Sequence, residues 1–193
     1  MSMDLVLSGF GKLRFLWKSR FFMLLVSQNS ILTKDNLSKC KWKGTTTCAL
    51  CTENESGHHL FFEWSTVKYV WSLLGYSFGS DCRPNNMNQY WIWIHRILPQ
   101  APNLHAVGLA AVCWPIWWTR NAVCFEDKRV KSPTEIICLI CSFLTYWAGL
   151  LKEDLKEQVI QGAEVVKSTA LYFHKQDLQL RTQEERQLVP FAG

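Results

Sequence analysis

Cys48, Cys51 and His59 have the residue types and the spacing of ligands for a zinc ion. The two cysteines form a Cys-x-x-Cys pair in a loop rich in Gly, Thr, Ser and Asn at residues 43–57, and seven residues separate Cys51 from His59. A two-residue spacer lets both sulfurs face one point about 2.3 Å away, and a histidine at the start of a following helix reaches that point from the other side. The pattern therefore predicts a zinc centre.

The segments that must position these ligands have the hydrophobic periodicity of helices. Residues 59–75 carry apolar side chains on one face, and Gly75 is expected to end that helix. Ser132, Pro133 and Glu135 have the pattern of a capping box at the start of a later helix. The helices expected from the chain cover residues 10–28, 33–37, 59–75, 89–98, 104–126, 133–151 and 153–173. No segment alternates strongly enough to predict a sheet.

These elements predict an all-α fold, in which a helical domain with a small Cys/His zinc-knuckle-like loop is followed by a helical hairpin. We expect residues 1–98 to form a basic N-terminal helix plus the zinc-binding-like module, and residues 99–173 to form a helical C-terminal extension. Residues 174–193 are polar, and we expect a frayed or disordered tail there.

The motifs around the cysteines resemble a known family. Residues 31–37 read ILTKDNL, residues 48–51 read CALC, residues 55–64 read ESGHHLFFEW, and a Val-Trp pair follows at 70–71. This order is similar to the zinc-binding domain found downstream of the reverse transcriptase in plant non-LTR (LINE-type) retrotransposons. A later segment, CWPIWWTRNAVCF at residues 113–125, is similar to a helix that such proteins often carry. The resemblance covers about residues 12–165 and implies a retrotransposon-derived C-terminal module with zinc as its cofactor.

The chain departs from the family pattern at Trp64, which stands where that pattern has a fourth cysteine. Three ligands plus water is a known zinc geometry, although it is typical of catalytic sites. Cys40 or Cys82 could replace the missing ligand, whereas His58 is less favourable because neighbouring helix residues point about 100° apart. Trp64 also fits the apolar face of its helix, so a metal-free loop held by packing remains the alternative.

The net charge of +5 is concentrated at the N-terminus. Residues 1–47 carry eight Lys and Arg against two Asp, which gives this segment a charge of +6. Basic side chains interleaved with aromatic ones can bind a phosphate backbone, and a solvated basic helix face is the plainer alternative. The candidate nucleic-acid-binding residues are Lys12, Arg14, Lys18, Arg20, Lys39, Lys41 and Lys43.

The sequence lacks four motifs that are typical of enzymes. It has no adjacent Asp-Asp pair for two-metal phosphoryl transfer, no Gly-rich phosphate loop, and neither a GxSxG nor an HExxH motif. We therefore expect a non-catalytic domain. For Arg120 we expect hydrogen bonds to backbone carbonyls at a helix end, rather than contact with phosphate.

Two alternatives to a nucleic-acid-binding domain stay open. Residues 153–173 could mediate self-association or bind another helical protein, and residues 136–151 could associate with a membrane. The second stretch spans only about 24 Å as a helix, so we expect a buried core helix instead. The N-terminus lacks the pattern of a secretory signal, and eight cysteines in such a chain are expected to be reduced. These features predict an intracellular protein of the nucleus or the cytoplasm.

Overall fold

The computed structural model describes residues 17–188, and within them the side chains of residues 21–184. Over this range the fold is all-α, as predicted, and it contains no strand apart from one isolated bridge between Thr47 and Asn54. The helices are α2 (Trp17–Ser27), α3 (Lys34–Lys39), the π-helix η2 (His59–Glu63), α4 (Ser65–Ser77), α5 (Met87–Ile97), α6 (Pro102–Glu126), α7 (Pro133–Ala148) and α8 (Glu153–Leu188).

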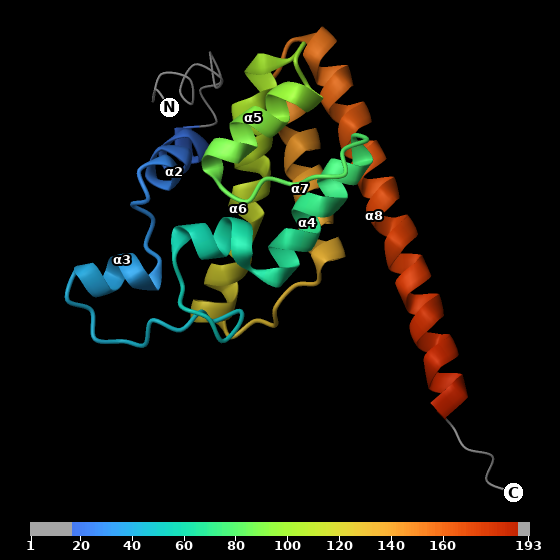
Figure 1. The fold of residues 1–193 in the computed structure, drawn as a ribbon. Coiled ribbons are helices and arrows are strands. Elements are labelled where there is room, and N and C mark those ends of the chain that lie inside the picture. Colours follow the sequence, from blue (N-terminus) through green and yellow to red (C-terminus); the bar gives the residue numbers. More distant parts are fainter. Residues whose placement is uncertain (1–16, 189–193) are drawn as a thin grey trace, which may run out of the picture.

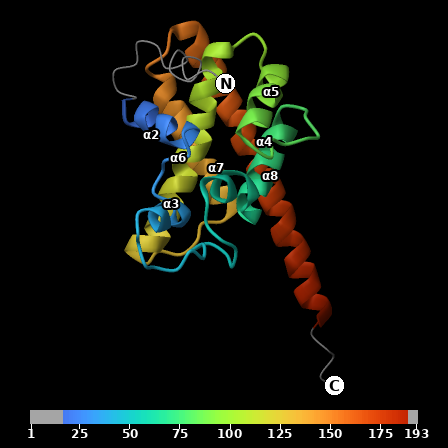
Figure 2. The same ribbon diagram turned by 60° about the vertical axis from the view of Figure 1, so that its left-hand side comes forward.

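Helix α6 runs through the middle of the molecule, where it contacts α2, η2, α5 and α7, and α8 packs against α7 and α4 (Figure 1). Helices α7 and α8 are antiparallel and joined by residues 149–152, which confirms the predicted helical hairpin. In the turned view, α2 crosses α6 on the side away from α8 (Figure 2). One apolar core contains side chains from every described helix except α3. The domain boundary that the sequence predicts between residues 98 and 99 stays a prediction.

Helix α7 begins where the sequence predicts. Ser132 accepts a hydrogen bond from the Glu135 backbone N–H, and the Glu135 carboxylate accepts one from the Ser132 backbone N–H. This reciprocal pair satisfies two donors that a helix start otherwise leaves free. The apolar stretch at residues 136–151 is buried in the core at Ile136, Ile137 and Ile140. None of the helices within residues 17–188 is long and apolar enough to span a bilayer.

The single helix predicted over residues 59–75 is wrong, because the structure divides it at Trp64. The backbone of Trp64 is extended, with ψ of 131°, and its N–H donates to the His59 carbonyl at 2.8 Å, which closes the π-helical turn. The Phe61 carbonyl accepts a hydrogen bond from the Trp71 indole at 2.8 Å instead of one from the backbone. A buried tryptophan thus compensates for the interruption, and α4 continues to Ser77.

The last helix is also longer than predicted. Helix α8 continues to Leu188 and extends beyond the body of the protein (Figure 1), so the polar tail predicted at 174–193 is helical up to that residue. Its distal part is stabilised by local pairs such as Asp177 with Arg181, whose charged atoms lie 2.9 Å apart. This part of the helix carries a few exposed leucines but no apolar face packed on the core, and hydrophobic periodicity therefore missed it. Residues 189–193 lie outside the described residues.

Candidate metal centre

Cys48 and Cys51 lie in a loop that is closed by hydrogen bonds between its own backbone groups. The Cys48 N–H donates to the Glu53 carbonyl at 2.7 Å, and the Glu55 N–H donates to the Thr46 carbonyl at 2.9 Å. Inside this closure, the Leu50 N–H points at the Cys48 sulfur, 3.4 Å away. A backbone N–H directed at sulfur stabilises the thiolate form that binds metal ions. The local sequence therefore builds a loop that presents its sulfur atoms together.

His59 completes the group from the first position of η2. Its backbone N–H donates to the Ser56 hydroxyl at 3.0 Å, which fixes the start of the turn. Its Nε2 lies 3.2 Å from the Cys51 sulfur, and the ligand atoms of Cys48, Cys51 and His59 all lie within 4.8 Å of one another. Tetrahedral zinc holds such atoms about 3.5–3.8 Å apart, so the three donors are of the types that suit this ion and lie close enough for small side-chain adjustments to bring them onto it.

Burial controls the chemistry of the Cys48 thiol. The side chain is 4% exposed, and desolvation raises its pKa to about 11. Transfer of a thiolate from water into this environment is unfavourable unless a positive charge lies beside it. A divalent cation supplies that charge and favours the deprotonated sulfur. The buried group is therefore suited to a bound metal ion rather than to nucleophilic or redox chemistry in solution.

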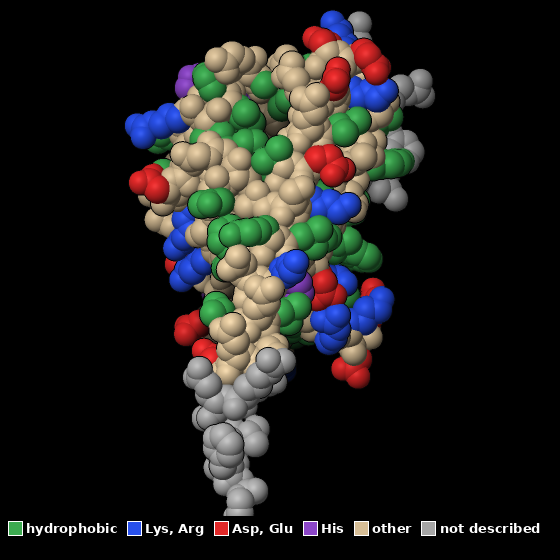
Figure 3. Space-filling view, turned by 90° about the vertical axis from the view of Figure 1, so that its right-hand side faces the viewer, with side chains coloured by type: hydrophobic (Ala, Val, Ile, Leu, Met, Phe, Trp, Pro, Cys, Tyr) green, Lys and Arg blue, Asp and Glu red, His purple; other side chains and the backbone are tan. Residues whose placement is uncertain are grey.

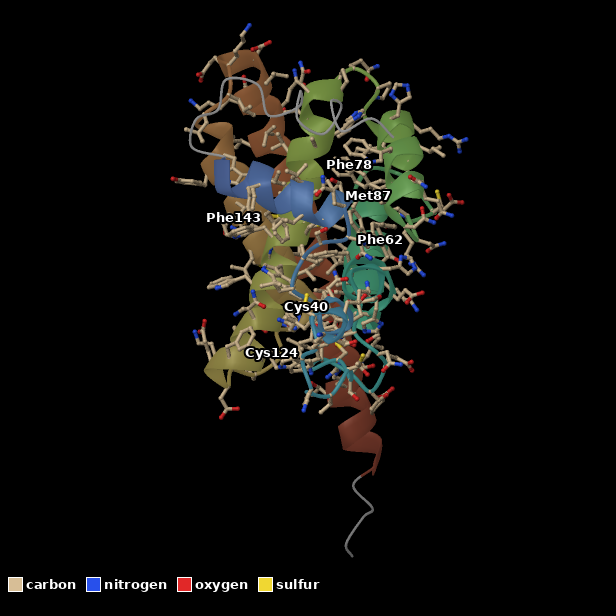
Figure 4. All side chains as sticks on the ribbon, turned by 90° about the vertical axis from the view of Figure 1, so that its left-hand side faces the viewer. Cys40, Phe62, Phe78, Met87, Cys124 and Phe143 are labelled. Carbon is tan, nitrogen blue, oxygen red and sulfur yellow. The ribbon has the colours of Figure 1, made fainter. Side chains whose placement is uncertain are left out.

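The fourth ligand position is not filled by the substitutes that the sequence suggested. Cys40 lies exposed at the end of α3 (Figure 4), and Cys82 lies exposed before α5, with its sulfur 3.4 Å from the Ser80 hydroxyl. Within the described residues, neither belongs to the group whose ligand atoms converge. His58 points instead to the Glu63 carboxylate at 3.2 Å.

Trp64, at the position of the family's fourth cysteine, is 2% exposed and packs in the core. The described residues therefore bring three ligands together, and water or a further molecule would complete a four-coordinate ion.

Sequence reasoning missed a buried ion pair beside this loop. Arg120 of α6 donates from Nη2 to Glu55 Oε1 at 2.6 Å and from Nε to Oε2 at 3.1 Å. The two side chains are 2% and 0% exposed. The expectation that Arg120 would bond backbone carbonyls at a helix end is wrong, because its guanidinium donates two hydrogen bonds to the Glu55 carboxylate. The available signal was Arg120 itself, the only charged residue in the aromatic and apolar motif at residues 113–125.

The candidate nucleic-acid residues are described only in part. Lys12 and Arg14 lie outside the described residues, and Lys18 and Arg20 belong to α2 without described side chains. Lys39, Lys41 and Lys43 are exposed at the end of α3 and in the chain that follows it. Three of the seven residues therefore lie exposed on the segment that leads into the cysteine loop.

The fold and the site together define a helical scaffold that carries a Cys/His loop able to hold a metal ion. Residues 9–71 match the family described as zinc-binding in reverse transcriptase, which confirms the resemblance for this domain. The matched segment contains all three ligands and ends at Trp71, while α6 and Arg120 lie beyond it. No curated protein and no solved structure matched the chain.

Proposed function

We propose that the chain is a non-catalytic, retrotransposon-derived zinc-binding domain that binds RNA or DNA through its basic N-terminal segment. The observation that carries this proposal is the convergence of Cys48, Cys51 and His59 inside the segment that matches the zinc-binding family. Zinc would hold the loop and the start of η2 in one arrangement. The domain would then present a fixed basic surface to a nucleic acid.

The described part of that surface supports a phosphate-binding role. Lys39, Lys41 and Lys43 are exposed, and among the described residues neither Lys41 nor Lys43 forms an ion pair with an acidic side chain. Trp42 lies between them with its ring against Gly44 and 41% of its surface exposed, and the exposed part of the ring could stack on a base. Unpaired cations beside an exposed aromatic ring favour the binding of single-stranded nucleic acid.

The basic segment is also connected to the cysteine loop. The Lys34 ammonium donates a hydrogen bond to the Thr47 carbonyl, one residue before Cys48. A metal ion that orders this loop therefore also restrains the start of α3. We expect zinc to strengthen nucleic-acid binding for this reason, although the lysines themselves are not ligands.

A binding experiment with matched variants tests the nucleic-acid role. We expect the full chain to bind single-stranded RNA or DNA with an affinity that falls steeply with salt. The triple variant Lys39→Gln, Lys41→Gln, Lys43→Gln should bind more weakly, with a salt slope smaller by about 2–3. The triple variant Lys152→Gln, Lys167→Gln, Lys175→Gln removes the same charge from exposed positions immediately before α8 and along it, and it should bind like the wild type. Equal losses in both variants would contradict a specific role for the N-terminal segment.

Helix α8 supports a second candidate function, in which the chain associates with itself or with another helical protein. Leu171 and Leu178 lie seven residues apart on the extended part of α8 and are 47% and 50% exposed. Hydrophobic side chains interrupt the polar surface along this helix (Figure 3). A mass that rises with protein concentration, and that falls in a Leu171→Gln, Leu178→Gln variant, would favour this alternative.

A further inference from the structure

We infer that Glu55 and Arg120 position the metal-binding loop, so that the working metal centre includes helix α6 and extends beyond the matched segment at residues 9–71. The inference rests on the proposed zinc-binding function and adds two positioning residues to it. Neither side chain is a metal ligand. Each acts through the backbone that carries Cys48, Cys51 and His59.

Glu55 occupies the centre of the loop's hydrogen-bond network. It lies four residues after Cys51 and four residues before His59, so its backbone separates the cysteine pair from the histidine. Its N–H donates to the Thr46 carbonyl at 2.9 Å, which closes the loop around the cysteines. Displacement of Glu55 would therefore move the cysteine side and the histidine side of the site relative to each other.

The same residue fixes the start of α3. The Lys34 backbone N–H donates to Glu55 Oε1 at 2.9 Å, and the Asp35 N–H donates to the Glu55 carbonyl at 3.2 Å. One glutamate thus contacts both α3, which belongs to the basic segment, and the loop. Its carboxylate is completely buried, so water cannot replace these contacts without a local opening of the structure.

Arg120 fixes Glu55 to the rest of the fold. The pair joins residues 65 positions apart, and both carboxylate oxygens accept hydrogen bonds from the guanidinium. Arg120 is itself oriented by Asn121, whose Oδ1 accepts from Nη1 at 2.9 Å, and by the Trp117 ring, whose centre lies 5.1 Å away. A lysine could keep the charge but not this two-pronged geometry.

Loss of the pair should be measured as loss of metal affinity. Without Arg120, the loop keeps its ligands but loses its anchor to α6, and metal binding must then restrict a more mobile loop. An isolated buried carboxylate would also favour opening of the loop to water. The expected change is a fall in zinc affinity of about tenfold or more, the range seen when residues that orient metal ligands are altered.

The test uses the full chain and zinc titration against a competing chelator. The double variant Glu55→Leu, Arg120→Met removes both charges and leaves no unpaired ion, so it should fold while it binds zinc at least about tenfold more weakly. The single variant Arg120→Lys keeps the charge balance and should show a smaller loss. Arg129→Met is the matched control, because it breaks another two-pronged pair, between Arg129 and Glu135, which is exposed.

Two further readouts separate positioning from general destabilisation. Replacement of zinc by Co²⁺ gives a visible spectrum that reports ligand geometry, and we expect it to change in the double variant and not in Arg129→Met. Limited proteolysis of the metal-free chain should cleave the loop at residues 43–57 faster in the double variant. The melting temperature of each metal-free variant shows how much global stability has changed.

The outcomes are distinguishable. A double variant or an Arg120→Lys variant that binds zinc as tightly as the wild type would overturn the inference and leave the proposed zinc function intact. A wild-type chain that binds no zinc would contradict both. If the double variant does not fold, Arg120→Lys decides the question, since a weakened affinity supports the positioning role and an unchanged affinity overturns it.

Discussion

The imidazole of His59 lies 3.2 Å from the sulfur of Cys51, although seven residues separate the two in sequence. The contact results from two local structures, the backbone-closed loop that ends at Glu55 and the π-helical turn that begins at His59. Both lie within the residues that match the zinc-binding family. The spatial relationship that the sequence spacing predicted is therefore present in the fold, without a fourth protein ligand in the converging group.

The first prediction concerns Trp64 and separates packing from metal binding. Trp64→Ala should lower the free energy of unfolding by about 3–5 kcal/mol, because it empties a large buried volume. The loss should be the same with and without zinc, since Trp64 is not a ligand. Chemical denaturation in zinc and in chelator measures both values. A loss seen only in the presence of zinc would contradict this role.

The second prediction concerns the indole of Trp71. Trp71→Phe keeps a ring in the core but removes the hydrogen bond from the indole N–H to the Phe61 carbonyl. This hydrogen bond is buried, and its donor and acceptor lie 2.8 Å apart. An unsatisfied buried carbonyl costs about 1–3 kcal/mol, so the variant should be destabilised by at least that amount. Trp118→Phe is the control, because Trp118 is 44% exposed. Equal stability losses for the two variants would argue against the hydrogen bond.

The third prediction concerns the contribution of Glu135 to the pH dependence of folding stability. Hydrogen bonds from Arg129, and next from the Ser132 backbone, lower the pKa of Glu135 to about 2 from an ordinary value of 4.5. The native state therefore favours the carboxylate. Its contribution to stability is complete above about pH 5 and is lost as the pH falls through 4.5 towards 2.

Denaturation of the wild type and of Glu135→Gln across pH 2–6 checks this sign. The stability difference between them should be constant above about pH 5 and should shrink as the pH falls. A difference that grows in acid would contradict the assignment. Glu153→Gln, at an exposed helix residue paired with Lys156, provides the comparison.

Sequence reasoning could predict the features that depend on local spacing. The ligand trio, the capping box at Ser132 and the helical hairpin follow from residues close to one another in the chain. The division of the helix at Trp64 could not be predicted in this way, because the Trp71 indole compensates for it through a contact that helical periodicity does not encode. The pair of Glu55 with Arg120 joins two distant motifs, and only the packing of α6 brings them together.

The most direct test of the central claim is the zinc content of the purified full chain, measured beside a Cys48→Ser variant. We predict about one zinc ion per wild-type chain and none in the variant, because Cys48 is one of three converging ligands. A wild-type chain that retains its helical signal but contains no zinc would contradict the claim. In that case Trp64 and its neighbours hold the loop by packing alone.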